Sequence, residues 1–271
     1  MKEFKVLISA LFVLILMACG DKRTDERIVS VTIEPQRYFA EKIAGDKFKI
    51  NCVVPAGQSP DGENGFPGEF DVSVKYEFTE DNELRIHYQG ICDEPTVANM
   101  TNHSYFNLSG NIKRPVTDCY LKLDSDKILE LDETCVPTGR EINIDNTPFD
   151  FKKLKLIGKD IDNKSHRQIE IGNGYDHVFL LNENKKIYME DKISKRNMTI
   201  KTNQECVVIY TMNYEHEKTS YTGKVPPIRH GICFETQRPP IGRNMCYLEE
   251  SLLKKGEQYE QKTEYIFNLV K

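Results

Sequence analysis

The sequence predicts an all-β fold, either a sandwich or a barrel, preceded by a short α/β-like segment. After residue 61, segments alternate apolar and polar residues with the two-residue period of a strand. Turn signals such as DNTP, GNGYD and LKKGE recur between these segments. The chain also has 13 Tyr and 13 Phe, residues that are common in strands. Its 271 residues fit one large domain or two small ones, and a hydrophobic content of 39% suffices for a core.

The first predicted strands of the all-β part form a hairpin. FDVSVKYEF and ELRIHYQGI each alternate, and Asp81 and Asn82 stand between them as the turn. Further strands are predicted at CYLKL, KKIYMEDKI, NMTIKT, CVVIYTMNY, HGICFE and TEYIFNLV. Helical spacing after residue 61 is confined to a possible turn in YLEESLLKKG.

The beginning of the chain has a different pattern of predicted secondary structure. IVSVTI and FKINCVV predict two strands, and EPQRYFAEKIAG between them has helical spacing that ends at Gly45, so a β-α-β start is expected. VVPAGQSPDGENGFPG follows, with three prolines and four glycines that mark turns. We expect a join here, which gives three parts: 1–19, 20–60 and 61–271.

Residues 1–19 are predicted to be a lipoprotein signal peptide. MKEFK carries two lysines, VLISALFVLILMA is apolar, and LMAC resembles a bacterial lipobox. Cys19 would then carry lipid, anchor the mature chain to a membrane and place it outside the cytoplasm. The apolar run is short for a membrane span. The alternative is a buried apolar helix.

Charge and cysteine content exclude several classes of protein. The chain has 37 basic and 42 acidic residues, a net charge of -5, and the basic ones are evenly spread, so nucleic-acid binding is not expected. Eight cysteines show no C-x-x-C spacing, which predicts neither a zinc site nor a disulfide framework. Such cysteines are typical of a reducing compartment, in tension with the export signal; the part from residue 61 alone would suggest a cytoplasmic protein.

Three residues are candidates for chemistry. His103, in TNHSYFNLSG, can exchange a proton near neutral pH. Asp176, in GNGYDHVFLL, can accept hydrogen bonds from sugar hydroxyls. Glu235, in RHGICFETQRPP, follows apolar residues that should raise its pKa toward that of a general base. The alternatives are a structural His, a turn or cap Asp, and a solvent-facing Glu.

Over residues 59–271 the chain resembles the aldose 1-epimerase, or galactose mutarotase, family. SPDGENGFPG, NELRIHY, TNHSYFNLSG, PTGREINIDNTPFDF, GYDHVFLL, YTMN, GICFETQ and KKGEQY match in order. The resemblance implies a large antiparallel β-sandwich with the sugar in an open cleft, interconverting the α and β anomers of hexoses such as galactose or glucose. It implies that Glu235 is the general base, His103 the general acid and Asp176 a sugar ligand, without metal or organic cofactor.

The chain also departs from that family. The family's N-terminal third, with an arginine and glycine-rich motif and a second active-site His, has no counterpart, and the first His here is His87. The resemblance therefore implies a truncated sandwich with impaired activity. Residues 1–60 instead resemble the start of zinc- or manganese-type solute-binding lipoproteins of ABC transporters. Their metal-binding part is missing, and residues 27–60 contain no His.

Four hypotheses follow. The leading one is a hexose mutarotase fused behind a lipoprotein start. The second is a carbohydrate-binding lipoprotein without turnover, and the third is a metal-binding transport component, which the scattered histidines disfavour. The fourth is a recombination or gene-model product.

Overall fold

The computed structural model describes residues 66–110, 112–215 and 225–270 in full, together with the backbone of two strands nearer the N-terminus. The chain divides into two compact units, Met1–Ala56 and Gly57–Lys271. In the first unit, β1 (Ile28–Ile33) pairs in parallel with β2 (Lys49–Val54). Both predicted strands are confirmed, and parallel pairing requires a crossover connection. The helix expected between them and the lipidation site at Cys19 lie outside the described residues.

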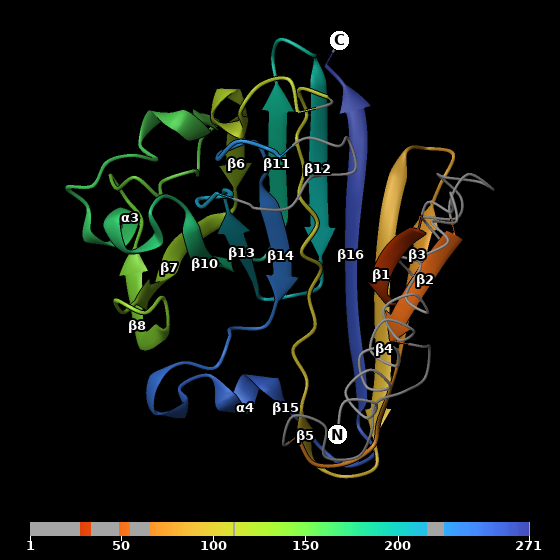
Figure 1. The fold of residues 1–271 in the computed structure, drawn as a ribbon. Helices are drawn as coiled ribbons and strands as arrows, with labels where there is room; N and C mark the ends of the chain where they lie inside the picture. The colour runs from red at the N-terminus through yellow and green to blue at the C-terminus, as the bar shows by residue number, and fades with distance from the viewer. Residues whose placement is uncertain (1–27, 34–48, 55–65, 111, 216–224, 271) are drawn as a thin grey trace, which may run out of the picture. The chain divides into compact units, whose positions relative to one another are not determined.

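The second unit contains a five-stranded antiparallel sheet (Figure 1). In spatial order its strands are β14 (Cys233–Gln237), β13 (Cys206–Tyr210), β10 (Asp176–Leu181), β7 (Ser125–Leu131) and β8 (Pro137–Asn143). β14 is therefore an edge strand, and a loop covers its free edge as described below.

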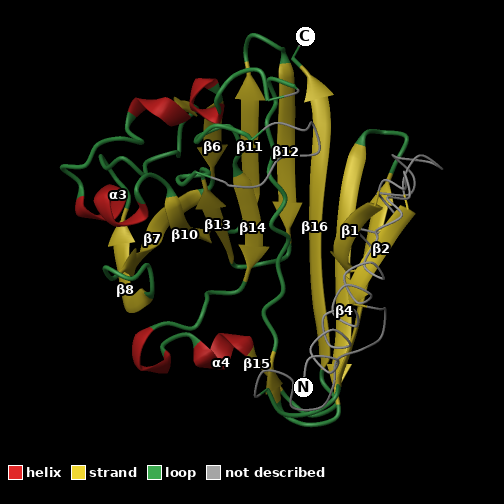
Figure 2. Ribbon diagram, viewed as in Figure 1, coloured by secondary structure: helices red, strands yellow, loops and turns green. Residues whose placement is uncertain are grey.

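A seven-stranded sheet, also antiparallel, is the other layer of this unit (Figure 2). Its spatial order is β3 (Phe70–Phe78), β4 (Glu83–Cys92), β16 (Gln258–Leu269), β12 (Arg196–Thr202), β11 (Lys186–Asp191), β6 (Tyr120–Leu123) and β9 (Lys155–Leu156). The predicted hairpin is confirmed as β3 and β4, with Asn82 at a positive φ of 60° in its turn.

The two sheets share one hydrophobic core. Buried residues of both sheets belong to a single cluster, for example Phe179, Ile209 and Phe234 from the five-stranded sheet and Met198 and Tyr265 from the seven-stranded sheet. Because side chains alternate along each strand, the opposite faces remain available for other contacts. The predicted antiparallel β-sandwich is thereby confirmed.

Short elements complete the second unit. β5 (Thr96–Val97) pairs with β15 (Leu252–Leu253), and α4 (Leu248–Ser251) corresponds to the helical turn predicted in YLEESLLKKG. α3 (Arg167–Gly172) was not predicted, because its 6 residues are too few for a periodic apolar pattern. In the parts of the chain that the structure describes, no helix has the length and apolar character needed to span a membrane.

Candidate functional site

The candidate residues lie on the face of the five-stranded sheet that points away from the core. In β14, Phe234 belongs to the core cluster, so its neighbours Cys233 and Glu235 project from the opposite face. In β10, His177 is fully buried against the core residue Phe149, with ring centroids 4.6 Å apart, and Asp176 projects from the opposite face. The two-residue period of a strand thus separates each functional side chain from the core.

Strand register brings these residues together. Asp176 pairs with Tyr210, and Tyr210 pairs with Cys233, so the three form one row across β10, β13 and β14. Glu235 pairs with Val208, one step further along the same face. Residues 59 positions apart in sequence, Asp176 and Glu235, therefore share one small area.

His103 arrives on a loop that runs along the free edge of β14. The side chain of Asn99 donates to the carbonyl of Arg238 at 2.9 Å, and Thr101 Oγ1 donates to the carbonyl of Thr236 at 3.1 Å. Phe106 then forms a β-bridge with Ile232, with N–O distances of 2.8 and 3.1 Å. Contacts on both sides of His103 fix the loop against β14. The motif TNHSYF is thus positioned beside the motif CFETQ.

His103 lies between two side chains of β14. Its Nε2 is 3.4 Å from Oε1 of Glu235, and its Nδ1 is 3.3 Å from Sγ of Cys233. The imidazole is half exposed, with 51% of its side-chain surface accessible, whereas Glu235 exposes only 13%. The sequence-predicted acid and base are therefore adjacent, and the acid remains open to a ligand.

Burial changes the acidity of both carboxyl groups. Desolvation raises the pKa of Glu235, and the nearby His103 partly opposes that shift. Desolvation, followed by repulsion from Glu235, raises the pKa of Asp176 to about 6, again with His103 opposing. A carboxyl group with a raised pKa is a stronger base once it is ionised, as proton abstraction near neutral pH requires.

The backbone at Asp176 is held by its neighbour. The amide of Asp176 donates to Nδ1 of His177 at 3.1 Å. Burial lowers the pKa of His177 to about 3, with a smaller contribution from His166, so the ring stays neutral and its Nδ1 can accept this bond. His177 is thus a structural histidine.

A polar clamp fixes the turn that precedes Asp176. Asn213 Nδ2 donates to the carbonyls of Gly172 at 2.6 Å and Tyr175 at 3.0 Å. Arg229 donates from its guanidinium to Oδ1 of Asn213 and, at 2.6 Å, to the carbonyl of Asn173. Arg229 and Asn213 were not predicted from sequence. Arg229 lies in RHGICFETQ and Asn213 in YTMN, two of the motifs quoted from the sequence, but their hydrogen-bond partners are remote in sequence.

Aromatic side chains surround the imidazole. The rings of Tyr105 and Tyr210 lie 5.2 Å and 6.0 Å from that of His103, centroid to centroid. Gly231 permits this packing, because a Cβ there would lie 2.8 Å from Cδ1 of Tyr105. Tyrosine rings with polar tips are well suited to contact the apolar and polar faces of a small polyol.

The residue types around the imidazole are also those that bind metal ions. Ligand atoms of His103, Cys233 and Glu235 lie within 4.8 Å of one another. However, Cys233 and Glu235 contact opposite nitrogens of the ring, whereas a metal ion takes one nitrogen from each imidazole. The arrangement fits a hydrogen-bonded series of groups better than a set of metal ligands.

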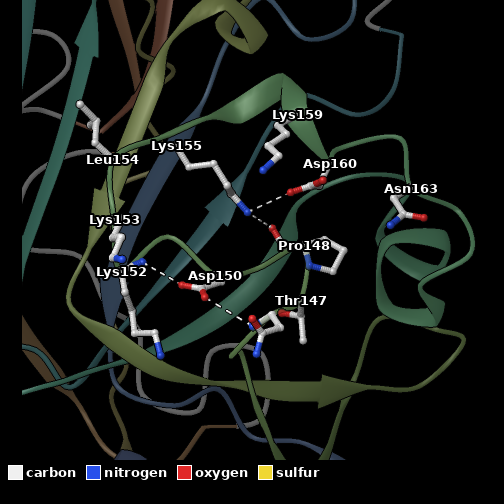
Figure 3. Close-up of a pocket in the computed structure, with 11 residues that line it drawn as sticks. Thr147, Pro148, Asp150, Lys152, Lys153, Leu154, Lys155, Lys159, Asp160 and Asn163 are labelled. Carbon is white, nitrogen blue, oxygen red and sulfur yellow. Dashed lines mark hydrogen bonds and ion pairs between the residues drawn. The ribbon is translucent and has the colours of Figure 1, made fainter.

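A separate pocket of about 580 Å³ lies on another part of the unit (Figure 3). Four lysines contribute to its lining, but Lys155 is bound by the carbonyl of Pro148 at 2.6 Å and by Asp160 at 3.2 Å, and Lys152 pairs with Asp145. The three predicted site residues do not line it. Two of the four lysines are therefore held by internal partners, and the lining contains no histidine, so the pocket offers no comparable acid–base pair.

The architecture is that of a two-sheet antiparallel sandwich with a histidine–carboxylate site on one outer face. The family model for aldose 1-epimerase matches residues 51–266. Its match begins a few residues before Ser59, where the resemblance noted in the sequence starts. The chain belongs to the aldose 1-epimerase family.

Individual relatives agree with that assignment. Galactose mutarotase of Sus scrofa is 35% identical over 238 residues, which are 86% of this chain and 68% of that protein. Aldose 1-epimerase of Haemophilus influenzae is 33% identical over 80% of this chain and 65% of its own length. The chain therefore spans about two thirds of the length of these curated relatives.

Solved structures show the same fold. A galactose 1-epimerase from Lactobacillus acidophilus superposes with a TM-score of 0.69 at 30% identity, covering 79% of this chain and 61% of that one. An aldose epimerase homologue from C. elegans superposes with a TM-score of 0.65 at 22% identity, covering 78% and 64%. The second likeness supports the fold alone.

Proposed function

We propose that this protein is an aldose 1-epimerase that interconverts the α and β anomers of a hexose such as galactose or glucose. The observation that carries the proposal is the contact of His103 Nε2 with Glu235 Oε1 at 3.4 Å, with Asp176 on the same face. A hemiacetal opens when one group removes the proton of the C1 hydroxyl and another protonates the ring oxygen. Both oxygens are bonded to C1, so the base and the acid must be neighbours.

The proposed reaction needs only proton transfers. Ionised Glu235 takes the proton of the C1 hydroxyl as the bond between C1 and O5 breaks, and the imidazolium of His103 gives its Nε2 proton to O5. The aldehyde rotates about the bond between C1 and C2. Neutral His103 then takes the proton back from the C5 hydroxyl while O5 attacks the other face of C1, and Glu235 returns its proton to O1. Asp176 accepts hydrogen bonds from sugar hydroxyls and holds the ring during these steps.

Polarimetry tests the proposal directly. The purified full chain should speed the decay of optical rotation of freshly dissolved α-galactose or α-glucose above the buffer rate, in proportion to protein concentration. Heat-treated protein is the control for catalysis by buffer components. A different result would favour the alternative, a sugar-binding protein that is not an enzyme. In that case galactose or glucose would stabilise the protein against thermal unfolding, but the protein would not accelerate mutarotation.

We further propose that the chain begins with a fused lipoprotein start, placed at residues 1–60 by the sequence although the family model already matches from residue 51, and that the protein is anchored outside the cytoplasm. The support is sequence alone: the charged start, the apolar run and LMAC before the acceptor Cys19. The expected result is that the protein expressed in bacteria partitions into the detergent phase of Triton X-114 and gains the mass of a lipid. Cys19→Ala should remove both properties, with Cys135→Ser as the control; equal partitioning of Cys19→Ala and the wild type would contradict the anchor.

The fusion itself is tested separately, by sequencing across the join in the source DNA.

A further inference from the structure

The second contact of the catalytic imidazole assigns a role to a residue outside the acid–base pair. Nδ1 of His103 lies 3.3 Å from Sγ of Cys233, a hydrogen-bond distance for sulfur. Cys233 is fully buried, and its position two residues before Glu235 on one strand places the thiol and the carboxylate on the same face. The imidazole is therefore held at both nitrogens by alternate residues of β14.

The two ring nitrogens must carry different duties during mutarotation. The nitrogen facing Glu235, Nε2, gives its proton to the sugar and later takes it back. Neutral imidazole can take the proton back at Nε2 only if its remaining proton is on Nδ1. The hydrogen bond made by one ring nitrogen decides which of these tautomers is present. A group that accepts a hydrogen bond from Nδ1 would thus leave Nε2 free to exchange its proton.

We propose that Cys233 is a positioning residue: its sulfur accepts a hydrogen bond from Nδ1–H of His103 in both protonation states and so makes Nε2 the exchanging nitrogen. This inference rests on the proposed function. It also gives a reason for a thiol here, because sulfur is a weak acceptor that accommodates an imidazolium without binding it strongly.

The surroundings keep the thiol neutral. Burial, followed by the nearby Glu235 and Asp176, raises the pKa of Cys233 well above its usual value. A thiolate would form an ion pair with the imidazolium and make it a poorer acid, as in cysteine–histidine pairs that activate a nucleophile. At this site the two carboxylates disfavour that state, so the neutral thiol remains available to accept a hydrogen bond from Nδ1.

The test compares three single substitutions in the full chain. Cys233→Ala removes the acceptor, and the expected result is a roughly tenfold or greater fall in kcat with little change in KM. Cys233→Ser restores an acceptor of similar size, and we expect it to recover most of kcat. Cys206→Ala is the matched control, since Cys206 is also buried, lies on the same sheet, packs in a small hydrophobic cluster and donates its thiol to the carbonyl of Gln237 at 3.2 Å, away from His103. It should leave kcat unchanged.

A pH profile separates positioning from a packing defect. The charged or titratable groups that face the imidazole are Glu235 and Cys233 of β14, Asp176 of β10, Tyr210 of β13 and, from its own loop, Tyr105. Cys233→Ala leaves the other four in place and removes only the acceptor of the charged ring. The alkaline limb of kcat should therefore move to lower pH in Cys233→Ala, but not in Cys206→Ala.

A spectroscopic readout does not depend on activity. Imidazole ¹⁵N resonances of the labelled protein, assigned with His103→Gln, should show the proton of neutral His103 on Nδ1 and a shift toward Nε2 in Cys233→Ala. A proton on Nε2 in the unsubstituted protein, or an equal loss of kcat in Cys233→Ala and Cys206→Ala, would overturn the proposal. If the chain shows no mutarotation, the tautomer still decides the role of Cys233, and only the proposed function fails.

Discussion

Glu235→Gln is expected to lower kcat for mutarotation by about 10²- to 10⁴-fold, the range for loss of a positioned general base. Gln has the shape of Glu and can occupy the same space on β14, but its amide cannot take a proton from the C1 hydroxyl. KM should change little, because Asp176 and the aromatic rings, the proposed sugar contacts, remain in place. The measurement is polarimetry at several sugar concentrations, together with a thermal unfolding curve to show that the fold is intact.

The chain offers a matched control for this substitution. Glu260 also lies beside a histidine, with His87 Nε2 3.1 Å from its Oε1, but that pair is on β16 and β4 of the other sheet. Glu260→Gln should therefore keep the wild-type kcat. A Glu235→Gln protein with more than half of the wild-type kcat would exclude Glu235 as the base.

The all-β fold was predictable because its signals are local. Alternation along FDVSVKYEF and ELRIHYQGI defines a strand face within a few residues, and the turn between them needs only Asp81 and Asn82. The order of strands within each sheet was not predictable in this way. β16 lies between β4 and β12, and that placement depends on contacts between segments far apart in sequence.

Some residues of the candidate site were likewise predictable from local sequence, and others were not. His103, Asp176 and Glu235 were found because each lies in a distinctive motif, and the structure brings all three to one sheet face. Cys233 and Arg229 were visible in the same motifs but carried no assignment. Their roles depend on what they contact, an imidazole from another loop and the turn before Asp176, and the sequence does not encode such contacts locally.

Asp176→Asn is expected to stabilise the protein at neutral and alkaline pH while weakening sugar binding. Burial and Glu235 raise the pKa of Asp176 from 3.8 to about 6. A raised pKa means that the folded state holds its proton more tightly than the unfolded chain does. The contribution of Asp176 to the free energy of unfolding is therefore most favourable below about pH 4, where the carboxyl group is protonated in both the folded and the unfolded chain. This contribution is lost as pH rises through 6.

The size of the effect follows from that shift. A shift of about two pKa units corresponds to about 3 kcal/mol between the protonated and ionised states, so ionised Asp176 lowers the free energy of unfolding by up to that amount at pH 8. Asn carries no charge and removes this penalty. Urea unfolding at pH 5 and pH 8 should show that the difference between Asp176→Asn and the wild type grows with pH, whereas Asp71→Asn, at an exposed position of β3, should show no such trend.

The proposed function gives a reason for a destabilising carboxylate at this position. An ionised carboxylate offers lone pairs to two sugar hydroxyls, whereas an amide offers one oxygen and places donors where acceptors are needed. Asp176→Asn should therefore raise KM even as it raises stability, the trade that is common where a site holds buried charge. The contrary result would be a difference in the free energy of unfolding between Asp176→Asn and the wild type that is the same at pH 5 and pH 8. Asp176 would then not titrate in the folded protein as its burial implies, and any destabilisation by this residue would have another origin.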